Sequence, residues 1–265
     1  MLELLEQLFR QVRVYVQSER YDRHQVYQRS PKHTTMLFDR EAEDLLIEGL
    51  EKSGLGFEVI TEERETLRTV ANPPYRIIVD PVDGSNNVSR GIMTAAVALA
   101  VLPIDAPVVP EEVQWALVGE LYSGTVYAAH QKGGAFRNGR RCQVSNAKSL
   151  QTSLIGLNLD QRCQSTIRTL FNNMPPYQVR RTGSSAIDSV YVASGTYDAY
   201  VDVGDVLTGE SFLASASIVL EAGGIVTDHR GQALRPVTNL TDGYSVVMAA
   251  SRELHQEILA SIRQP

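Results

Sequence analysis

The sequence has few cysteines and no long apolar run. Its 265 residues include two cysteines, Cys142 and Cys163, which can form at most one bridge and lack the spacing of metal ligands. The sequence is therefore not that of a disulfide scaffold. The longest apolar segment, 94–103, has the length of a β-strand and falls far short of the ~20 residues that span a bilayer. The N-terminus lacks the unbroken apolar stretch of a signal peptide, so we expect a cytoplasmic protein with no membrane contact.

The sequence also lacks a basic stripe. Its formal net charge is −6, and acids and bases are mixed along the whole chain, which argues against a nucleic-acid partner. The one dense basic cluster, 137–141 (RNGRR), contains an Asn-Gly pair and predicts a solvated hairpin. The apolar content of 43% suffices for a real hydrophobic core, in one large domain or two small ones.

Hydrophobic periodicity predicts a mixed first half and an alternating second half. In the first half we expect a helix at the N-terminus, a polar loop at 20–32, a helix that opens within 34–39 and ends near Lys52, and a loop at 64–74. The strands expected there are 57–61, 76–80, 95–103, 113–122 and 125–130. In the second half we expect strands 153–159, 177–181, 197–203, 225–228 and 244–250, and helices 161–172, 184–195, 211–222 and 252–263. This order suggests layered helices and sheets.

The most informative segment is 80–91, DPVDGSNNVSRG, which directly follows the apolar run 75–79. That run predicts a buried strand ending in two carboxylates, Asp80 and Asp83. A hard cation such as Mg²⁺ prefers oxygen ligands, and Pro81 favours the turn that would let both acids face one. The strand end therefore predicts a divalent-cation site.

The residues around the two acids extend this prediction to a phosphate. The Val82 carbonyl is a further candidate ligand, and Gly84 and Ser85 are compatible with a helix start, whose free N–H groups bind phosphate oxygens. A cation and a phosphate side by side are what metal-assisted phosphate hydrolysis needs. The spacing rejects an EF-hand calcium loop, because Gly84 is fifth rather than sixth and Gly91 stands where a glutamate is required. A structural alternative is a capped turn with Asp83 as the helix N-cap.

A second pair of acids, Glu62 and Glu63, follows the strand expected at 57–61. Ligands of α/β proteins gather outside strand ends, so these acids and Asp80 would form one carboxylate cluster. Such a cluster repels itself unless a cation neutralises it. A solvated loop is the structural alternative for Glu62 and Glu63 alone.

The motifs together resemble the inositol monophosphatase family, within the lithium-sensitive, Mg²⁺-dependent phosphatases that include fructose-1,6-bisphosphatases. The segment 80–88, DPVDGSNNV, is similar to the family signature D-P-(I/L/V)-D-G-(T/S)-x-N-(F/Y), with Val88 in place of the aromatic residue. VITEE at 59–63 resembles the family's strand ending in G-E-E, and Asp39 stands where the family has a helix-opening Asp. Further similar segments are GGAFRNG at 133–139, RTGSSA at 181–186 and EAGG at 221–224.

The resemblance implies a role for each matching residue. Metal ligands would be Glu62, Asp80, the Val82 carbonyl and Asp83. Catalysis would involve Asp39 and the Ser85 hydroxyl, which orient and activate a water, together with Glu62. Substrate would be bound by Asp83, by the Gly84 and Ser85 amides, by Ser184 and Ser185, and by Asp202, which matches a family acid that touches substrate hydroxyls. The resemblance also implies two or three Mg²⁺ ions and inhibition by Li⁺.

One departure concerns the family's second signature, W-D-x-A-A/G, whose Asp is a ligand of the second metal. Counting back ten residues from Glu221 reaches Ser211, not Asp, and about two extra residues follow Asp202. Three outcomes remain open: Glu210 supplies the carboxylate, Asp205 supplies it, or the ligand is lost. A weak second site would make the enzyme require high Mg²⁺.

The resemblance implies an α/β fold, a layered αβαβα sandwich of the sugar phosphatase type. We expect a single unit over 1–265, with pseudo-halves of about 1–147 for metal and phosphate and 148–265 for the substrate side. The expected function is Mg²⁺-dependent hydrolysis of a small phosphorylated polyol or sugar, with fructose 1,6-bisphosphate or a 3′-phosphoadenosine nucleotide as alternative substrates. A different class, a binding protein that has lost turnover, follows if the position of Ser211 disables the site. The resemblance also implies a homodimer.

Overall fold

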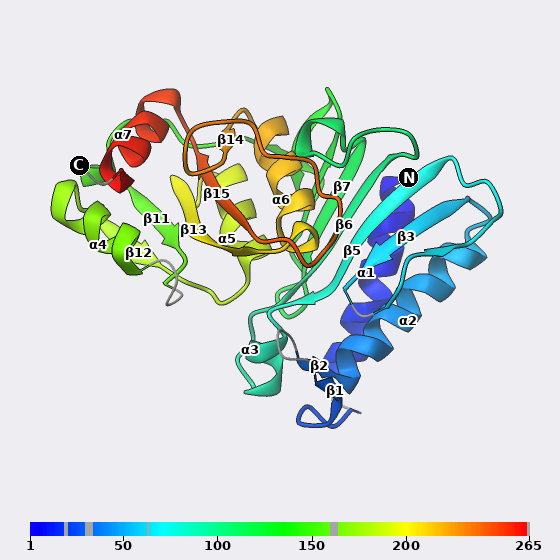
Figure 1. Ribbon diagram of the computed structural model, residues 1–265. Helices are drawn as coiled ribbons and strands as arrows, with labels where there is room; N and C mark the ends of the chain where they lie inside the picture. The colour runs from blue at the N-terminus through cyan, green and yellow to red at the C-terminus, as the bar shows by residue number, and fades with distance from the viewer. Residues whose placement is uncertain (19–20, 30–33, 63, 160–163, 264–265) are drawn as a thin grey trace.

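The computed structural model describes residues 1–18, 21–29, 34–62, 64–159 and 164–263, and these fold into five layers of helices and sheets (Figure 1). The outer helices on one side are α1 (Leu2–Gln17) and α2 (Leu37–Lys52), and those on the other are α4 (Gln164–Asn173) and α7 (Arg252–Ile262). Two sheets follow inwards, with α5 (Ser185–Ala193) and α6 (Gly209–Glu221) between them. This confirms the expected αβαβα sandwich.

The larger sheet has eight strands in the order β10-β9-β8-β7-β6-β5-β3-β4. Only its β3–β5 pair is parallel among the pairs the structure describes. The strands are β3 (Phe57–Thr61), β4 (Leu67–Arg68), β5 (Tyr75–Asp83), β6 (Ala96–Pro103), β7 (Trp115–Glu120), β8 (Val126–His130), β9 (Gly134–Arg137) and β10 (Arg140–Cys142). The β9–β10 hairpin confirms the hairpin predicted for 137–141, because Asn138 and Gly139 both have the positive φ that its tight turn needs.

The smaller sheet has five strands in the order β12-β11-β13-β15-β14. The strands β11 (Leu154–Leu157) and β12 (Gln178–Arg180) run parallel to each other, and β11 runs parallel to β13 (Ala199–Leu207). The strand β15 (Tyr244–Ala249) is antiparallel to both β13 and β14 (Ile225–Thr227). Two short 3₁₀ turns, Pro110–Glu112 and Leu150–Thr152, lie in connections.

Successive side chains on a strand point to opposite faces of its sheet, and they contribute to three separate hydrophobic cores. On β5, Ile77 and Val79 pack with α1 and α2, whereas Ile78 between them packs with α5 and α6. On β13, Val201 faces the third core under α4 and α7, and Tyr200 faces α5 and α6. Both faces of each sheet are therefore buried, which explains the nearly continuous apolar runs in the sequence.

Several elements differ from the sequence-based expectation. The segment expected as a loop at 20–32 contains β1 (Val26–Arg29), which pairs with β2 (Thr34–Met36) at the place where a helix was expected to open. The two strands are close in sequence, but neither has the alternation of apolar and polar residues by which a strand is predicted. The expected loop at 64–74 also contributes the two-residue edge strand β4.

The strand β5 runs through Pro81 to Asp83, three residues beyond the expected end. In the described part of the chain, no helix has both the length and the apolar character needed to cross a membrane. The end of β5, the short helix α3 (Ser85–Ser89) and the N-terminal ends of α5 and α6 come together, through the contacts described next.

Candidate active site

A β-bulge at Pro81 brings the two acids of β5 to the same face of the sheet. Asp80 pairs with Ala98 and Asp83 pairs with Ala96, so β5 has one residue more than β6 in this interval. Residues three apart in a regular strand point to opposite faces, and the extra residue cancels this difference. Both carboxylates therefore face α5 and α6.

Asp83 is held by three donors from the start of α5. The Ser184 hydroxyl (2.5 Å) and the Ala186 amide (2.7 Å) donate to Oδ2, and the Ser185 hydroxyl donates to Oδ1 at 3.2 Å. Burial raises the pKa of Asp83 to about 6, although these hydrogen bonds favour the ionised form. Ser184 is itself the N-cap of α5, so the cap of one helix is joined directly to the end of β5.

Asp80 is held from α6. The Ser211 hydroxyl donates to its Oδ2 at 3.2 Å, and the Val82 amide donates to its Oδ1 at 3.2 Å. Burial raises the pKa of Asp80 well above its usual value, and the negative charges of Asp83, Glu62 and Glu210 raise it further. These four carboxylates are thus close enough to repel one another. Glu62 follows β3 and its side chain is exposed, whereas Glu63 lies outside the described residues.

Glu210, in the first turn of α6, is 2% exposed. The Thr208 hydroxyl donates to its Oε1, while Oε2 is buried and has no hydrogen-bond partner in the described structure. Burial and the charge of Glu62 raise its pKa to about 8. Asp205 is placed differently, because its carboxylate accepts a 2.6 Å hydrogen bond from Ser245, on β15.

Asp39 and Ser85 meet across 46 residues of sequence. The Ser85 hydroxyl lies 2.9 Å from Asp39 Oδ1 and 2.8 Å from the Val82 carbonyl oxygen. The other carboxylate oxygen of Asp39 accepts the Met36 amide at 3.1 Å, at the start of α2. Asp39 is 1% exposed. Its buried carboxylate is therefore held on one side by the Met36 amide at the start of α2 and on the other by the Ser85 hydroxyl of α3.

A cavity of about 360 Å³ opens beside these groups. Of the predicted substrate residues, Asp83, Ser184, Ser185 and Asp202 line it. Gly84 and Ser85 do not, but they directly precede Asn86, which does. The other lining residues are Asn158, Arg181, Gly183, Asp188, Tyr200, Val206, Leu207, Thr208 and Ser211.

Asp202 points into a small polar group on the smaller sheet. Its Oδ2 accepts the Asn158 amide at 2.8 Å and the Tyr200 hydroxyl at 3.4 Å. Sequence reasoning missed Asn158, which comes next to Asp202 because Leu157 on β11 pairs with Val201 on β13. The pairing of β11 with β13 cannot be predicted from the sequences of the two strands alone.

Asp188 was missed as well. It is buried on α5, accepts the Thr182 amide at 3.3 Å and lines the cavity. Burial raises its pKa to about 7. A signal was present in the sequence, because a lone acid in the apolar segment 185–193, SAIDSVYVA, falls on a helix that must be largely buried.

The donor set fits a hard divalent cation. Glu62, Asp80, Asp83 and Glu210 offer only oxygen, and the unpartnered Oε2 of Glu210 is a buried acceptor that a cation would satisfy. No three Asp, Glu, His or Cys side chains within the described ranges already converge in an ion-binding arrangement. Binding would therefore require these carboxylates to turn toward a common point.

Comparison with known proteins agrees with this geometry. The model of the inositol monophosphatase family matches residues 1–265. A fructose-1,6-bisphosphatase/inositol-1-monophosphatase of Methanothermobacter thermautotrophicus is 32% identical over 238 residues, 86% of this chain and 83% of the relative. An inositol-1-monophosphatase of Mesorhizobium japonicum is 30% identical over 249 residues, 91% of this chain and 87% of the relative. The crystal structure of the extragenic suppressor protein suhB from Bartonella henselae shares the fold, with a TM-score of 0.84 and 24% identity over 99% of this chain and 98% of that one. The chain belongs to the inositol monophosphatase family.

Proposed function

We propose that the protein hydrolyses a small phosphorylated polyol or sugar, such as an inositol monophosphate, to the alcohol and inorganic phosphate, with Mg²⁺ as its cofactor. The observation that carries the proposal is the Asp39–Ser85 pair beside the buried acids Asp80 and Asp83, next to a polar cavity. Named relatives support it, because they are called inositol-1-monophosphatase and fructose-1,6-bisphosphatase.

The Ser85 hydroxyl would bind and orient the attacking water. Its single proton has two acceptors within 3 Å, Asp39 Oδ1 and the Val82 carbonyl. With that proton committed, the lone pairs of Oγ can accept a hydrogen bond from a water. As this water attacks phosphorus, its proton passes to Ser85 Oγ while the Ser85 proton passes to Asp39. The ester P–O bond breaks, and the leaving alkoxide takes a proton from solvent.

The cavity residues would hold the alcohol part of the substrate. Asp83, Asp188 and Asp202 line the cavity with carboxylates, which accept hydrogen bonds and therefore suit the hydroxyl donors of a polyol. The cavity volume of about 360 Å³ lies at the small end of the range for ligand pockets, roughly 300–1,000 Å³. A compact polyol phosphate is favoured over a large nucleotide on this ground.

Glu62, Asp80, Asp83 and the Val82 carbonyl would hold the metal, with Glu62 also orienting the water. When bound, Mg²⁺ would offset the negative charge of phosphate and lower the pKa of the water. Two or three ions and inhibition by Li⁺ are expected from the family resemblance. Without a cation, the same carboxylates repel a phosphate, so chelation should abolish turnover.

A phosphate-release assay tests the proposal. Inositol 1-phosphate, fructose 1,6-bisphosphate and 3′-phosphoadenosine 5′-phosphate would be compared at equal concentration, with Mg²⁺ and with excess chelator. We expect Mg²⁺-dependent release, fastest from the inositol or sugar ester. The rival possibility, a protein that binds such esters without turnover, predicts saturable binding of inositol 1-phosphate and no release at any Mg²⁺ concentration.

A homodimer is also proposed, on the family resemblance alone. Light scattering coupled to size-exclusion chromatography would report about twice the chain mass of 29.3 kDa. A peak at the mass of one chain over the micromolar range would exclude it.

A further inference from the structure

The first turn of α6 lies directly against the acids of β5. Ser211 donates to Asp80, and the Ser185 hydroxyl, which donates to Asp83, also lies 3.5 Å from the Ser211 carbonyl oxygen. Ser211 therefore reaches Asp80 through a neutral hydroxyl. The nearest carboxylate on α6 belongs to the preceding residue, Glu210.

A large bulge in β13 sets where α6 begins. Asp202 pairs with Val246 and Leu207 with Tyr244, so four residues of β13 lie opposite a single residue of β15. Asp205 lies within this bulge, with φ of 50°. It packs so closely on Gly243 that a Cβ there would lie 1.9 Å from the Asp205 carbonyl oxygen. The bulge is thus fixed by contact with the start of β15.

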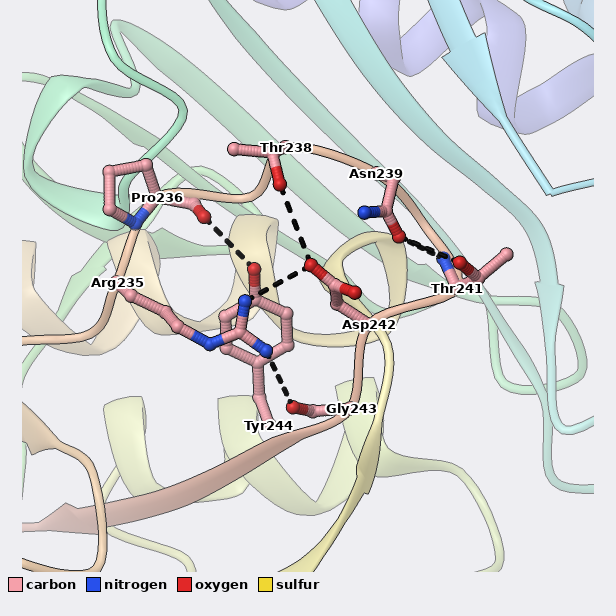
Figure 2. Close-up of polar contacts among 8 residues, drawn as sticks. All are labelled: Arg235, Pro236, Thr238, Asn239, Thr241, Asp242, Gly243 and Tyr244. Atoms are coloured by element: carbon pink, nitrogen blue, oxygen red, sulfur yellow. Dashed lines mark hydrogen bonds and ion pairs between the residues drawn. The ribbon is translucent and has the colours of Figure 1, made fainter.

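The same part of the chain fixes the rotation of α6. The ring of Tyr244 packs on that of Phe212 of α6, with the two ring centres 5.1 Å apart. The guanidinium of Arg235 lies over the Tyr244 ring, 4.2 Å from the ring centre. Arg235 in turn donates to Asp242 and to the Gly243 carbonyl, while the Tyr244 hydroxyl donates to Pro236 (Figure 2). Glu210 therefore lies in the first turn of a helix that packs, through Phe212, on this hydrogen-bonded segment.

Within the described ranges, Glu210 forms no ion pair with a basic side chain. Its Oε2 is buried without a hydrogen bond in the described structure, and the charges that act on Glu210 there include those of the acids Glu62, Asp83 and Asp80. A buried carboxylate without a partner is strongly unfavourable unless it is neutralised. A cation shared with the neighbouring carboxylates neutralises it and satisfies the empty acceptor in one step.

We propose that Glu210 is a ligand of a divalent cation shared with Asp80, and that it supplies from one residue earlier the carboxylate that Ser211 lacks. The inference deepens the proposed function, because it assigns this ion to the same site. Thr208 would position Glu210 through its hydrogen bond to Oε1, which leaves Oε2 for the ion. Asp205 is directed elsewhere, because its carboxylate accepts a hydrogen bond from Ser245 and the residue lines a separate cavity with Arg235.

The test is direct binding of Mn²⁺, as a probe for Mg²⁺, to the full chain without substrate. Free Mn²⁺ is counted by electron paramagnetic resonance, and heats of binding are measured by calorimetry. For Glu210→Gln we expect one bound ion fewer than in the wild type, or at least ~10-fold weaker binding of one ion. Asp205→Asn is the matched control, because it removes one charge from the same segment and Asn tolerates positive φ. Its binding should stay within about twofold of the wild type.

Thermal melting separates ligand loss from misfolding. Mn²⁺ should raise the melting temperature of the wild type and of Asp205→Asn, and raise that of Glu210→Gln distinctly less. Equal ion number, equal affinity and an equal Mn²⁺-induced shift in Glu210→Gln would overturn the inference. Binding is measured without turnover, so the two proposals can fail separately. If Glu210→Gln binds one ion fewer but the wild type releases no phosphate, the proposed function is refuted and the inference stands.

Discussion

Ser85 shows how one side chain links the metal-binding strand to a distant helix. Its hydroxyl lies between Asp39 of α2 and the Val82 carbonyl of β5, both within 3 Å. Neither acceptor lines the cavity. The expected consequence is that the residue acts on the attacking water rather than on the ester itself.

Replacing Ser85 by alanine should therefore lower kcat by ~10²-fold or more and change KM little, because the water loses its orienting acceptor. Ser85→Thr keeps the hydroxyl and should retain most of the activity. Ser89→Ala is the matched control, since the Ser89 hydroxyl only donates to Asn86 within the same short helix. Steady-state kinetics would check this, and an unchanged kcat in Ser85→Ala would contradict the role.

Asp188 predicts a pH dependence of stability. Burial raises its pKa from 3.8 to about 7 in the folded protein. The folded state therefore holds this proton more tightly, so the stability linked to Asp188 is fully present below about pH 4 and is lost as pH rises through about 7. The groups that act on Asp188 include Thr182, Asp83, Arg181, Tyr197 and Tyr200.

The variant Asp188→Asn should remove this loss. We expect it to be more stable than the wild type at pH 8 by on the order of 1–3 kcal/mol, with a much smaller difference at pH 4. Urea unfolding at both pH values measures this, with the exposed Glu51→Gln as control. A difference that does not grow with pH would show that Asp188 titrates normally.

The residues that could be predicted from sequence are those with a fixed local spacing. Asp80, Asp83 and Ser85 lie within one turn-forming segment, whereas their partners Asp39, Ser184 and Ser211 come from distant parts of the chain. Asn158 and Asp188 could not be predicted as cavity residues, because their placement depends on which strands pair and which helix face is covered. Position 211 was recognised as a departure, but the direction of Glu210 required the bulge in β13.

At the scale of elements, the junction of β5 and α3 depends on Gly84. Its φ is 106°, and a Cβ there would lie 3.1 Å from the Thr94 carbonyl oxygen and 3.3 Å from Ala95 Cα. Glycine is therefore required twice, by the backbone angle and by the close approach of the neighbouring chain. The junction positions Ser85 and both acids.

The variant Gly84→Ala should destabilise the protein by about 1–3 kcal/mol and lower kcat sharply. Gly139→Ala separates the two causes, because Gly139 has φ of 72° but nothing within 4 Å of its added Cβ. Chemical denaturation should show a clearly larger loss for Gly84→Ala, and only this variant should lose activity. Equal losses of stability would mean that the close approach to Thr94 contributes nothing.

Elements with strong apolar periodicity were predictable, and those shaped by tertiary contacts were not. The apolar runs of β5 and β6 predicted strands, but the proline in β5 concealed that the strand continues, since a bulge tolerates proline where a regular ladder would not. The antiparallel pair of β1 and β2 was missed because these strands have no apolar alternation. Local sequence does not encode either feature.

At the scale of the whole molecule, α6 is the shared centre of the two sheets. It packs against β5, β6, β7, β8 and β9 of the larger sheet and against β14 and β15 of the smaller one. The layer order was expected from family resemblance, whereas the strand order could not be read from the sequence. A common central helix predicts that both sheets unfold together.

Phe212→Ala should test this cooperativity. Phe212 is 1% exposed on α6 and packs on Tyr244 of β15. Its truncation should cost about 3–5 kcal/mol and lower a single melting transition by roughly 10 °C. Calorimetry that resolves two transitions, only one of which moves, would show instead that the halves unfold independently.

We propose that Asp80 and its neighbouring acids bind the cation that makes phosphate-ester hydrolysis possible. The most direct measurement is phosphate release from inositol 1-phosphate during a Mg²⁺ titration of the wild type and of Asp80→Asn. We expect saturable, Mg²⁺-dependent release by the wild type, abolished by chelator, and a loss of at least ~10²-fold in Asp80→Asn. Release that persists without divalent cations, or that Asp80→Asn leaves intact, would contradict it.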